Sequence, residues 1–530
     1  MDCRRLYAYE LLLWLLCLSS SAVAQSSLSG DLQTDLKVFM RDSAIGAINT
    51  PQYDYLLSGL DGWLTVNYVT TGFDARLRLD VFNNSNLQDP NQAFTGAGIG
   101  YFHLSKQIEK LQVTGGYFYE QFGGGMIYRA YEDRGLGLDY ATFGLNLKYK
   151  LTENWQVKGI AGQQKNRFSR YAPVIKGLNT EATLSLGSSA QVVPGAAFLN
   201  RTLDKATMDI VAGLINSYEP EDRFVPRYNV YAFSGYYTLY AGPVTWYVEG
   251  AAKTPEAILG AEGILVNKPG SIGYTSLNYV REGLGLTLQF KRTENFELRI
   301  SPLETLLNGV LNFLPPMARQ NSLRLPARYS PATQFLGEQA FQADLTYSPA
   351  EPWVIDVNFS HINDLDGNKL WREVYAQADV TASETDHLLF GGQYIFYNQQ
   401  VYLSEPLPDQ TALTAFVEYT RRLSQMHSLR TEVQYMHTEQ DFGSFLFVLA
   451  EYNMAPRWSF SISDMYNIQP NPEKTTTREH YYNFFVSYTQ GPTRFALAFA
   501  RQVAGINCSG GVCRYEPAFN GVKCSITTSF

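Results

Sequence analysis

The chain has 530 residues, of which 45% are hydrophobic, 14% aromatic and only 17% charged. Its formal net charge of −8 argues against a nucleic-acid partner and against a polybasic lipid-binding surface, because both need clustered positive charge. A soluble chain of this length would divide into several cores, yet no linker, charge block or change of composition divides this sequence.

The first residues predict export. Two arginines precede a short apolar stretch, Leu11–Leu18, and the small residues Ala22 and Ala24 follow at the positions that signal peptidase reads. The apolar stretch is too short to remain as a membrane anchor. We therefore expect residues 1–24 to be a cleaved signal peptide and residues 25–530 to form the mature domain.

The mature sequence alternates apolar and polar side chains. Between Phe73 and Phe82, apolar residues alternate with charged ones that include Arg78 and Asp80. Because successive side chains of a strand point to opposite faces, such a segment has one apolar and one polar face. The same pattern recurs at 143–150, 284–291, 353–360 and 429–435. No apolar run approaches the roughly 20 residues of a transmembrane helix.

Strand length and loop length distinguish a membrane barrel from a soluble sandwich. The alternating segments run to about ten residues, as in tilted membrane strands, whereas soluble strands average roughly 5–6 residues. Short connections at 70–72, 152–154, 348–352, 423–426, 455–457 and 490–492 alternate with long ones at 83–93, 123–140, 168–177, 216–228, 301–337, 401–410, 469–477 and 504–520. Tight turns at one end and long loops at the other favour the barrel.

Pairing the strands across short turns gives hairpins, a first strand near Asp31–Met40 and a last strand near Val522–Phe530. This predicts an all-β fold, a single antiparallel transmembrane barrel of about 24 strands within a range of roughly 22–26. Both termini would lie in the periplasm of a cell whose outer membrane holds the barrel. Phe530 ends an alternating strand and looks like the signal that the outer-membrane assembly machinery reads. Outer-membrane lipid and that machinery are therefore the expected partners.

One segment carries a specific pattern. It reads FYEQFGGG over residues 118–125 and YRAYEDRGLG over residues 128–137. This resembles the signature YEQFGxG, RxYEzRxLG, with z acidic, of a family of Bacteroidota outer-membrane proteins catalogued as a domain of unknown function. The resemblance implies a large outer-membrane barrel over the whole mature chain, and it implies no activity.

The same segment gathers charged side chains around glycines, and it is the best candidate site. The charged residues are Glu120, Arg129, Glu132, Asp133, Arg134 and Asp139. If the loop folds inward, these side chains would form a charged constriction in the lumen, as in porins. The alternative is an ion-paired loop that braces the barrel wall. Gly123–Gly125 lacks the Lys-Ser/Thr of a phosphate-binding loop, so nucleotide binding is not supported.

Other chemistry is weakly represented. The six histidines are scattered without metal-ligand spacing, and no G-x-S-x-G elbow is present. We expect no catalytic residue, no metal and no cofactor. Cys508 and Cys513 lie in the last outer loop, where an oxidising compartment would allow a disulfide. Cys524 remains on the apolar face of the last strand.

A barrel of about 24 strands would leave a large hole unless something fills it. No plug domain is expected ahead of the first strand, so the loop at 301–337 is the best internal filler. Its apolar residues at helical spacing predict a helix; they are Leu303, Leu306, Leu307, Val310, Leu311 and Leu314. We expect porin-like passive transport with loops that occlude the lumen. The alternative is a structural subunit of an assembly or secretion complex, with protein partners at the surface, and an enzyme ranks third.

Overall fold

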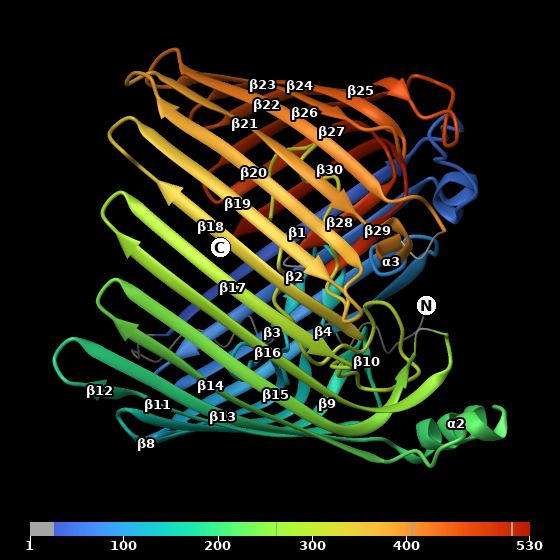
Figure 1. Ribbon diagram of the computed structural model, residues 1–530, viewed down its shortest axis with the longest axis vertical. Coiled ribbons are helices and arrows are strands. Elements are labelled where there is room, and N and C mark those ends of the chain that lie inside the picture. The colour runs from blue at the N-terminus through green and yellow to red at the C-terminus, as the bar shows by residue number, and fades with distance from the viewer. Residues whose placement is uncertain (1–25, 261, 404–405, 510–511) are drawn as a thin grey trace.

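The computed structural model describes residues 26–260, 262–403, 406–509 and 512–530. The predicted signal peptide lies outside these residues. Within them, tilted antiparallel strands form one large barrel (Figure 1). The all-β expectation is confirmed.

The wall is built from long strands that pair in chain order. Its first half contains β1 (Ser27–Phe39), β2 (Ser58–Thr70), β3 (Phe73–Ser85), β4 (Phe94–Ile108), β5 (Leu111–Phe118), β8 (Thr142–Thr152), β9 (Trp155–Asn166), β11 (Val174–Ala182), β13 (Ala190–Thr202), β14 (Asn229–Ala241), β15 (Val244–Leu259) and β16 (Leu265–Arg281). Its second half contains β17 (Leu284–Glu294), β18 (Gly337–Tyr347), β19 (Trp353–Asn363), β20 (Lys369–Thr381), β21 (Asp386–Tyr397), β22 (Gln410–Arg422), β23 (His427–His437), β24 (Gly443–Met454), β25 (Trp458–Pro470), β26 (His480–Gln490), β27 (Thr493–Gln502) and β30 (Phe519–Ser529).

The barrel closes between its first and last strands. β1 pairs with β30 along a register that includes Leu36 opposite Cys524. Two backbone hydrogen bonds join Gly30 and Phe530, at 2.8 and 3.0 Å. The closed wall described here has 24 strands, inside the predicted range. Closure leaves no unpaired sheet edge, which a lipid environment requires.

Shorter elements decorate the wall and the loops. β12 (Leu184–Leu186) continues the edge of β11, and the other short strands are β10 (Ser169–Arg170), β6 (Glu132–Asp133), β7 (Leu138–Asp139), β28 (Gly505–Ser509) and β29 (Val512–Glu516). The helices are η1 (Gln52–Leu56), α2 (Lys205–Asn216), η2 (Pro220–Asp222) and α3 (Gln399–Leu403). In the described part of the chain, none of them has the length and apolar content needed to traverse a bilayer.

The two rims of the barrel differ as predicted. Short turns such as 71–72 and 491–492 lie at one rim, on the left of Figure 1, and α2 and α3 lie in connections at the opposite rim. β1 begins and β30 ends at the short-turn rim, because the start of β1 pairs with the end of β2 beside the first short turn. Short connections therefore gather at one rim of the barrel and long connections at the other.

Burial along the strands is inverted relative to a soluble protein. On β3 the apolar side chains of Leu77 and Val81 are exposed, whereas Arg78 and Asp80 are buried. Apolar residues therefore face outward and charged residues face the lumen. This arrangement is stable only if lipid covers the outside.

Tryptophans mark one edge of the lipid-facing band. Trp155, Trp353 and Trp458 are the first residues of their strands, and Trp246 is the third residue of its strand, all directly after short turns. All four are exposed. Tryptophan is enriched where hydrocarbon meets water, because its ring is apolar and its N–H is polar.

Two loops fold into the lumen. We call residues 119–141, between β5 and β8, plug loop 1, and residues 295–336, between β17 and β18, plug loop 2. Plug loop 2 crosses the lumen: the Val310 carbonyl accepts a 2.7 Å hydrogen bond from Gln164 on β9, and the Leu325 amide donates one of 2.7 Å to Gln434 on β23. The expectation that this loop fills the barrel agrees with these contacts.

The helix predicted over 303–314 is wrong. Plug loop 2 instead folds back on itself there, with a hydrogen bond of 2.7 Å from the Ile300 amide to the Gly309 carbonyl. The tip contains Leu306, which has a positive φ of 53° and is 84% exposed. Further along, the Leu311 carbonyl accepts a hydrogen bond from Arg129 in plug loop 1. Contacts between the loops therefore replace the hydrogen bonds that a helix would make along itself.

The plug loops pack as a protein core does. One buried cluster joins Phe122 and Met126 of plug loop 1 to Leu311 of plug loop 2 and to wall residues such as Ile160 and Ile272. A second cluster joins Met317 and Leu325 to the wall between β18 and β26. The apolar side chains of both clusters are thus removed from water, which stabilises the loops in place.

Candidate functional site

Plug loop 1 is held against the wall at its glycines. The Gly124 amide donates a 2.8 Å hydrogen bond to the Glu249 carboxylate on β15. A β-carbon at Gly124 would lie 2.6 Å from that carboxylate, and Gly125 has a φ of 92°. The glycines at 123–125 therefore allow the backbone to approach a carboxylate of the wall closely. This contact gives the glycine run a structural role.

Glu120 is the centre of one charged cluster. Its buried carboxylate lies 2.7 Å from Lys148 Nζ and 3.1 Å from Lys158 Nζ, on the neighbouring strands β8 and β9. Asn146 adds a hydrogen bond of 3.2 Å. Burial raises the pKa of the Glu120 carboxyl, but the two lysines outweigh burial and hold the pKa below its ordinary range.

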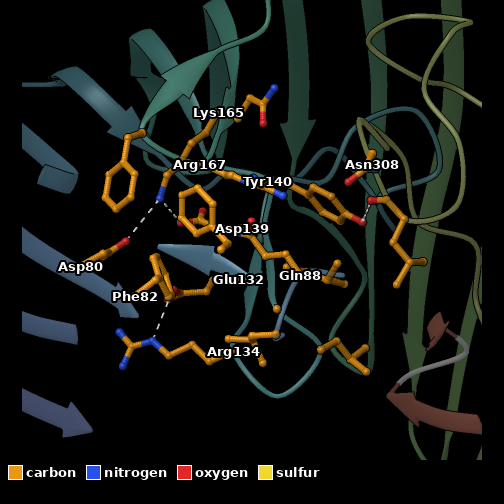
Figure 2. A pocket seen from close by; sticks show the side chains of 18 of the residues that line it. Asp80, Phe82, Gln88, Glu132, Arg134, Asp139, Tyr140, Lys165, Arg167 and Asn308 are labelled. Atoms are coloured by element: carbon orange, nitrogen blue, oxygen red, sulfur yellow. Dashed lines mark hydrogen bonds and ion pairs between the residues drawn. The ribbon is translucent and has the colours of Figure 1, made fainter. Parts of the chain in front are cut away.

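Arg78 is the centre of a second charged cluster. Its guanidinium contacts Asp80 at 2.6 Å, Glu132 at 2.6 Å and Asp139 at 2.8 Å, and all four side chains come from β3 or plug loop 1. Lys165 on β9 contacts Asp139 and lies 3.7 Å from Asp80. Figure 2 shows Lys165 between these two carboxylates. Such buried charges are tolerated because each faces an opposite charge.

The pKa values of two carboxyls in this cluster, Glu132 and Asp139, are shifted in opposite directions. Burial raises the pKa of Glu132 above its ordinary range, in spite of Arg78 and Arg134. Burial acts on Asp139 in the same way, but Lys165 and Arg78 outweigh it and lower the pKa of that carboxyl. Asp139 therefore stays charged and anchors both cations.

Arg134 connects plug loop 1 to the seam of the barrel, by which we mean the pairing of β1 with β30 that closes the wall. It lies 3.3 Å from Glu132 and 3.9 Å from Asp31 on β1, and it donates a 3.1 Å hydrogen bond to Gln33. Its guanidinium also lies over the ring of Trp63, 5.2 Å from the centroid.

The six predicted residues do not form one site. Glu132, Arg134 and Asp139 meet in the Arg78 cluster, and Glu120 belongs to the separate lysine cluster. Arg129 contacts aromatic rings instead, with its guanidinium 4.1 Å from the centroid of Phe313. The Asp133 carboxylate accepts a hydrogen bond from the Leu136 amide within its own turn.

The wall partners of these residues were missed as site residues. Arg78 and Asp80 stood in the sequence as the polar face of an alternating strand, as did Lys148. What could have identified them in the sequence is that each is a charged side chain at a strand position that faces the lumen. Sequence alone did not indicate which lumen-facing charge would meet the loop.

A cavity of about 710 Å³ lies beside the Arg78 cluster (Figure 2). Its lining includes Arg78, Glu132 and Arg134, together with Phe94 and Phe168 near the long-loop rim. The cavity is therefore a water-accessible part of the lumen with charges of both signs on its walls.

Two further sequence predictions stay predictions. β28 and β29 place Cys508 opposite Cys513 in backbone register, and Cys513 is disulfide-bonded; the Cys508 side chain lies outside what the structure describes. Phe530 covers Gly30, where a β-carbon would lie 2.4 Å from the phenyl ring. That contact fixes the end of β30 at the seam, and its role in assembly is untested. The described residues contain no group of three or more His, Cys, Asp or Glu side chains that could hold a metal ion.

A closed antiparallel wall, an apolar outside with tryptophans at its edge and a charged lumen define a transmembrane β-barrel of the bacterial outer membrane. Within that class, the chain belongs to the "Family of unknown function (DUF6029)", whose model matches residues 5–530. The predicted family type is thus confirmed, and the Bacteroidota source stays a prediction. No curated protein matches the sequence.

Solved structures share the barrel architecture at low identity. The translocation pore of the P pilus usher PapC has 10% identity and a TM-score of 0.44, and the alignment covers 95% of this chain and 99% of that chain. The ferric enterobactin receptor PfeA of Pseudomonas aeruginosa has 9% identity and a TM-score of 0.44, with 96% and 82% covered. OccK8 (OprE) of Pseudomonas aeruginosa has 8% identity and a TM-score of 0.37, with 83% and 97% covered. Similarity at this level says nothing about the activity of this chain.

Proposed function

We propose that the protein is a porin-like passive transporter whose own loops narrow the lumen. The observation that carries this proposal is a pair of cavities that the plug loops leave beside the seam of the barrel. The cavity of about 710 Å³ and a second of about 500 Å³ share Leu87 and Arg514 in their linings. A plug that served only to seal the barrel would have no need of neighbouring cavities on one side.

The cavities extend inward from the long-loop rim. Phe94, the first residue of β4, lines the outer cavity. A third cavity of about 330 Å³ shares Trp63 with the first and Lys523 with the second, and it reaches Gln33 in the middle of β1. Small polar solutes are the class that fits, because the linings are charged and the cavities have the volume of small-molecule sites.

Ion selectivity tests this function. The purified full-length barrel should conduct in planar bilayers, and the Glu132→Gln and Arg134→Gln variants should shift cation-to-anion selectivity in opposite directions, since charges along a pore decide which ions enter. Lys205→Gln is the matched control, because Lys205 is a highly exposed residue of α2. A silent recording from folded protein would overturn the proposal.

A structural subunit is the second candidate, and α2 favours it. The helix buries Met208, Val211 and Ile215 against the barrel, yet it leaves Ile210 at 55% and Leu214 at 42% exposure. Exposed apolar groups at a rim are typical of contact with another protein. If the barrel is a subunit, Ile210→Ser with Leu214→Ser should release a protein that co-purifies in stoichiometric amount. Retention of every co-purifying protein by this variant would argue against the subunit.

A further inference from the structure

The cavity of about 500 Å³ has an excess of positive charge, and we call it the basic chamber. It lies between plug loop 2, the β28–β29 hairpin and the β1–β30 seam. The cationic side chains in its lining are Lys37, Arg319, Arg324, Arg328, Arg514 and Lys523. Glu516 is the one carboxylate among the described lining residues. The chamber therefore differs from the neighbouring cavity, where the two signs are balanced.

Three of the six cations are compensated. Arg328 lies 2.8 Å from the carboxylate of Asp441, and Arg514 donates a 2.9 Å hydrogen bond to Glu516. Lys37 lies 3.9 Å from Asp61. In the part of the chain that the structure describes, these three are the lining cations whose charged groups pair with a carboxylate within 4 Å.

The charged groups of the other three cations form no ion pair with a described carboxylate, although the backbone amide of Arg319 donates a hydrogen bond of 3.3 Å to Glu373. Lys523 donates a 2.8 Å hydrogen bond to the neutral amide of Gln502. The guanidinium of Arg319 lies over Tyr375, 4.2 Å from the ring centroid, and its Nε is buried without a hydrogen bond. Arg324 is exposed to the chamber and has no hydrogen bond or ion pair with a described side chain.

Arg324 has the least favourable position of the three. The surrounding protein reduces the hydration of its guanidinium even though the side chain borders the chamber, and this desolvation, followed by repulsion from Arg328, lowers the pKa of Arg324 to about 10. It still carries its charge at neutral pH. The cations of the chamber repel one another, and a mobile ion of opposite sign would relieve that repulsion.

We propose that the basic chamber binds a small multivalent anion bearing phosphate or carboxylate groups, and that such anions are the solutes which the lumen admits. The first part stands on the chamber alone, whereas the second rests on the proposed transport function. Arginine forks pair with phosphate and carboxylate oxygens through two parallel hydrogen bonds. A volume of about 500 Å³ is in the range of small-molecule sites.

Binding to the purified full-length barrel tests the site. Isothermal titration at low ionic strength should show binding of citrate or of inorganic phosphate, and comparison of the two decides which oxyanion is preferred. Arg324→Gln should weaken binding by about tenfold, as loss of one charge-assisted contact does. Lys205→Gln removes a positive charge outside the lumen and should leave binding unchanged.

Arg324→Gln should also be folded, because the side chain stabilises nothing that the structure describes. The variant should melt at or above the temperature of the unmodified protein without anion, and it should lose the anion-dependent rise. No binding of either anion, or equal binding by Arg324→Gln, would overturn the site. Binding without any effect of citrate or phosphate on bilayer currents would keep the site and overturn its role in transport.

Discussion

The lumen has two unlike sides. Along β9–β26, the plug loops pack into buried apolar clusters that include Phe122, Leu311 and Trp371. Nearer the seam, the same loops leave neighbouring cavities whose walls are charged. The difference indicates that apolar packing on one side fixes the loops, which leaves the other side free for water and solute.

The two cavities at the seam also differ in charge. Around Arg78 three carboxylates meet two further cations, so the cluster braces plug loop 1. In the basic chamber, the charged groups of Arg319, Arg324 and Lys523 form no ion pair with a described carboxylate. We therefore expect the charges around Arg78 to hold plug loop 1 and the cations of the basic chamber to bind anions. Substitutions can remove either set without the other.

Removal of plug loop 2 would abolish the difference between the packed and the open side of the lumen. It should have the largest effect of the changes proposed, and the measured quantity is single-channel conductance. Replacing residues 299–331 with a short Gly-Ser linker removes the segment that crosses from β9 to β23. Single-channel conductance should rise by about an order of magnitude or more, because a barrel of this strand number is otherwise wide. Deletion of residues 205–216 should leave conductance unchanged. Equal conductance of the two deletions would show that plug loop 2 does not occlude the lumen.

The braced side should depend on Arg78. Arg78→Met leaves Asp80, Glu132 and Asp139 without their shared cation, which should destabilise plug loop 1 by about 3–5 kcal/mol. Limited proteolysis of the folded barrel would show cleavage within residues 119–141. Arg76→Met is the control: Arg76 is exposed two residues away on β3, so its loss should cost about 1 kcal/mol or less. Equal protection of both variants would contradict bracing.

The wall was predictable from sequence to a greater extent than the lumen. Alternation at Phe73–Phe82 fixed which side chains of β3 face inward, and the turn spacing gave the strand number, because both signals are local. The placement of Leu303–Leu314 was not local: apolar spacing suggested a helix, but contacts with plug loop 1 decided the backbone. The basic chamber was also beyond local reasoning, since Lys37, Arg324 and Lys523 come from distant parts of the chain.

The seam that borders the open side should depend on Phe530. Its ring covers Gly30, and its backbone makes two hydrogen bonds to that residue. Deletion of Phe530 should reduce the amount of folded, heat-modifiable barrel several-fold, by an amount equivalent to about 2 kcal/mol of lost contacts. Lys523→Gln, on the lumen face of the same strand, should assemble normally. Normal assembly without Phe530 would show that the last residue carries no signal.

Acid should loosen the braced side through Glu120. The folded state lowers the pKa of this carboxyl, so its stabilising contribution is complete above its ordinary value of 4.5 and is lost as the pH falls through the lowered value. Protection of plug loop 1 from protease should decrease below that range. Glu120→Gln should cost about 2 kcal/mol at neutral pH and should remove this part of the acid response. An unchanged pH profile in the variant would exclude Glu120 as the cause.

The smallest effect is expected from the cysteines beside the basic chamber. A Cys508–Cys513 bridge closes a short loop, so Cys513→Ser should cost at most about 2–3 kcal/mol and leave the wall intact. The mass of a peptide that contains both cysteines should increase by two hydrogens after reduction. Free labelling of both thiols in intact cells would contradict the bridge.

Both plug loops are attached to the wall on the same side of the barrel. Plug loop 1 connects the end of β5 to the start of β8, and plug loop 2 connects the end of β17 to the start of β18, so all four attachment points lie at the long-loop rim. Each loop is a tether fixed at both ends to that rim. A loop held at both ends is not lost from the barrel when it moves: it leaves the lumen as a doubled-back segment and can return to the same contacts.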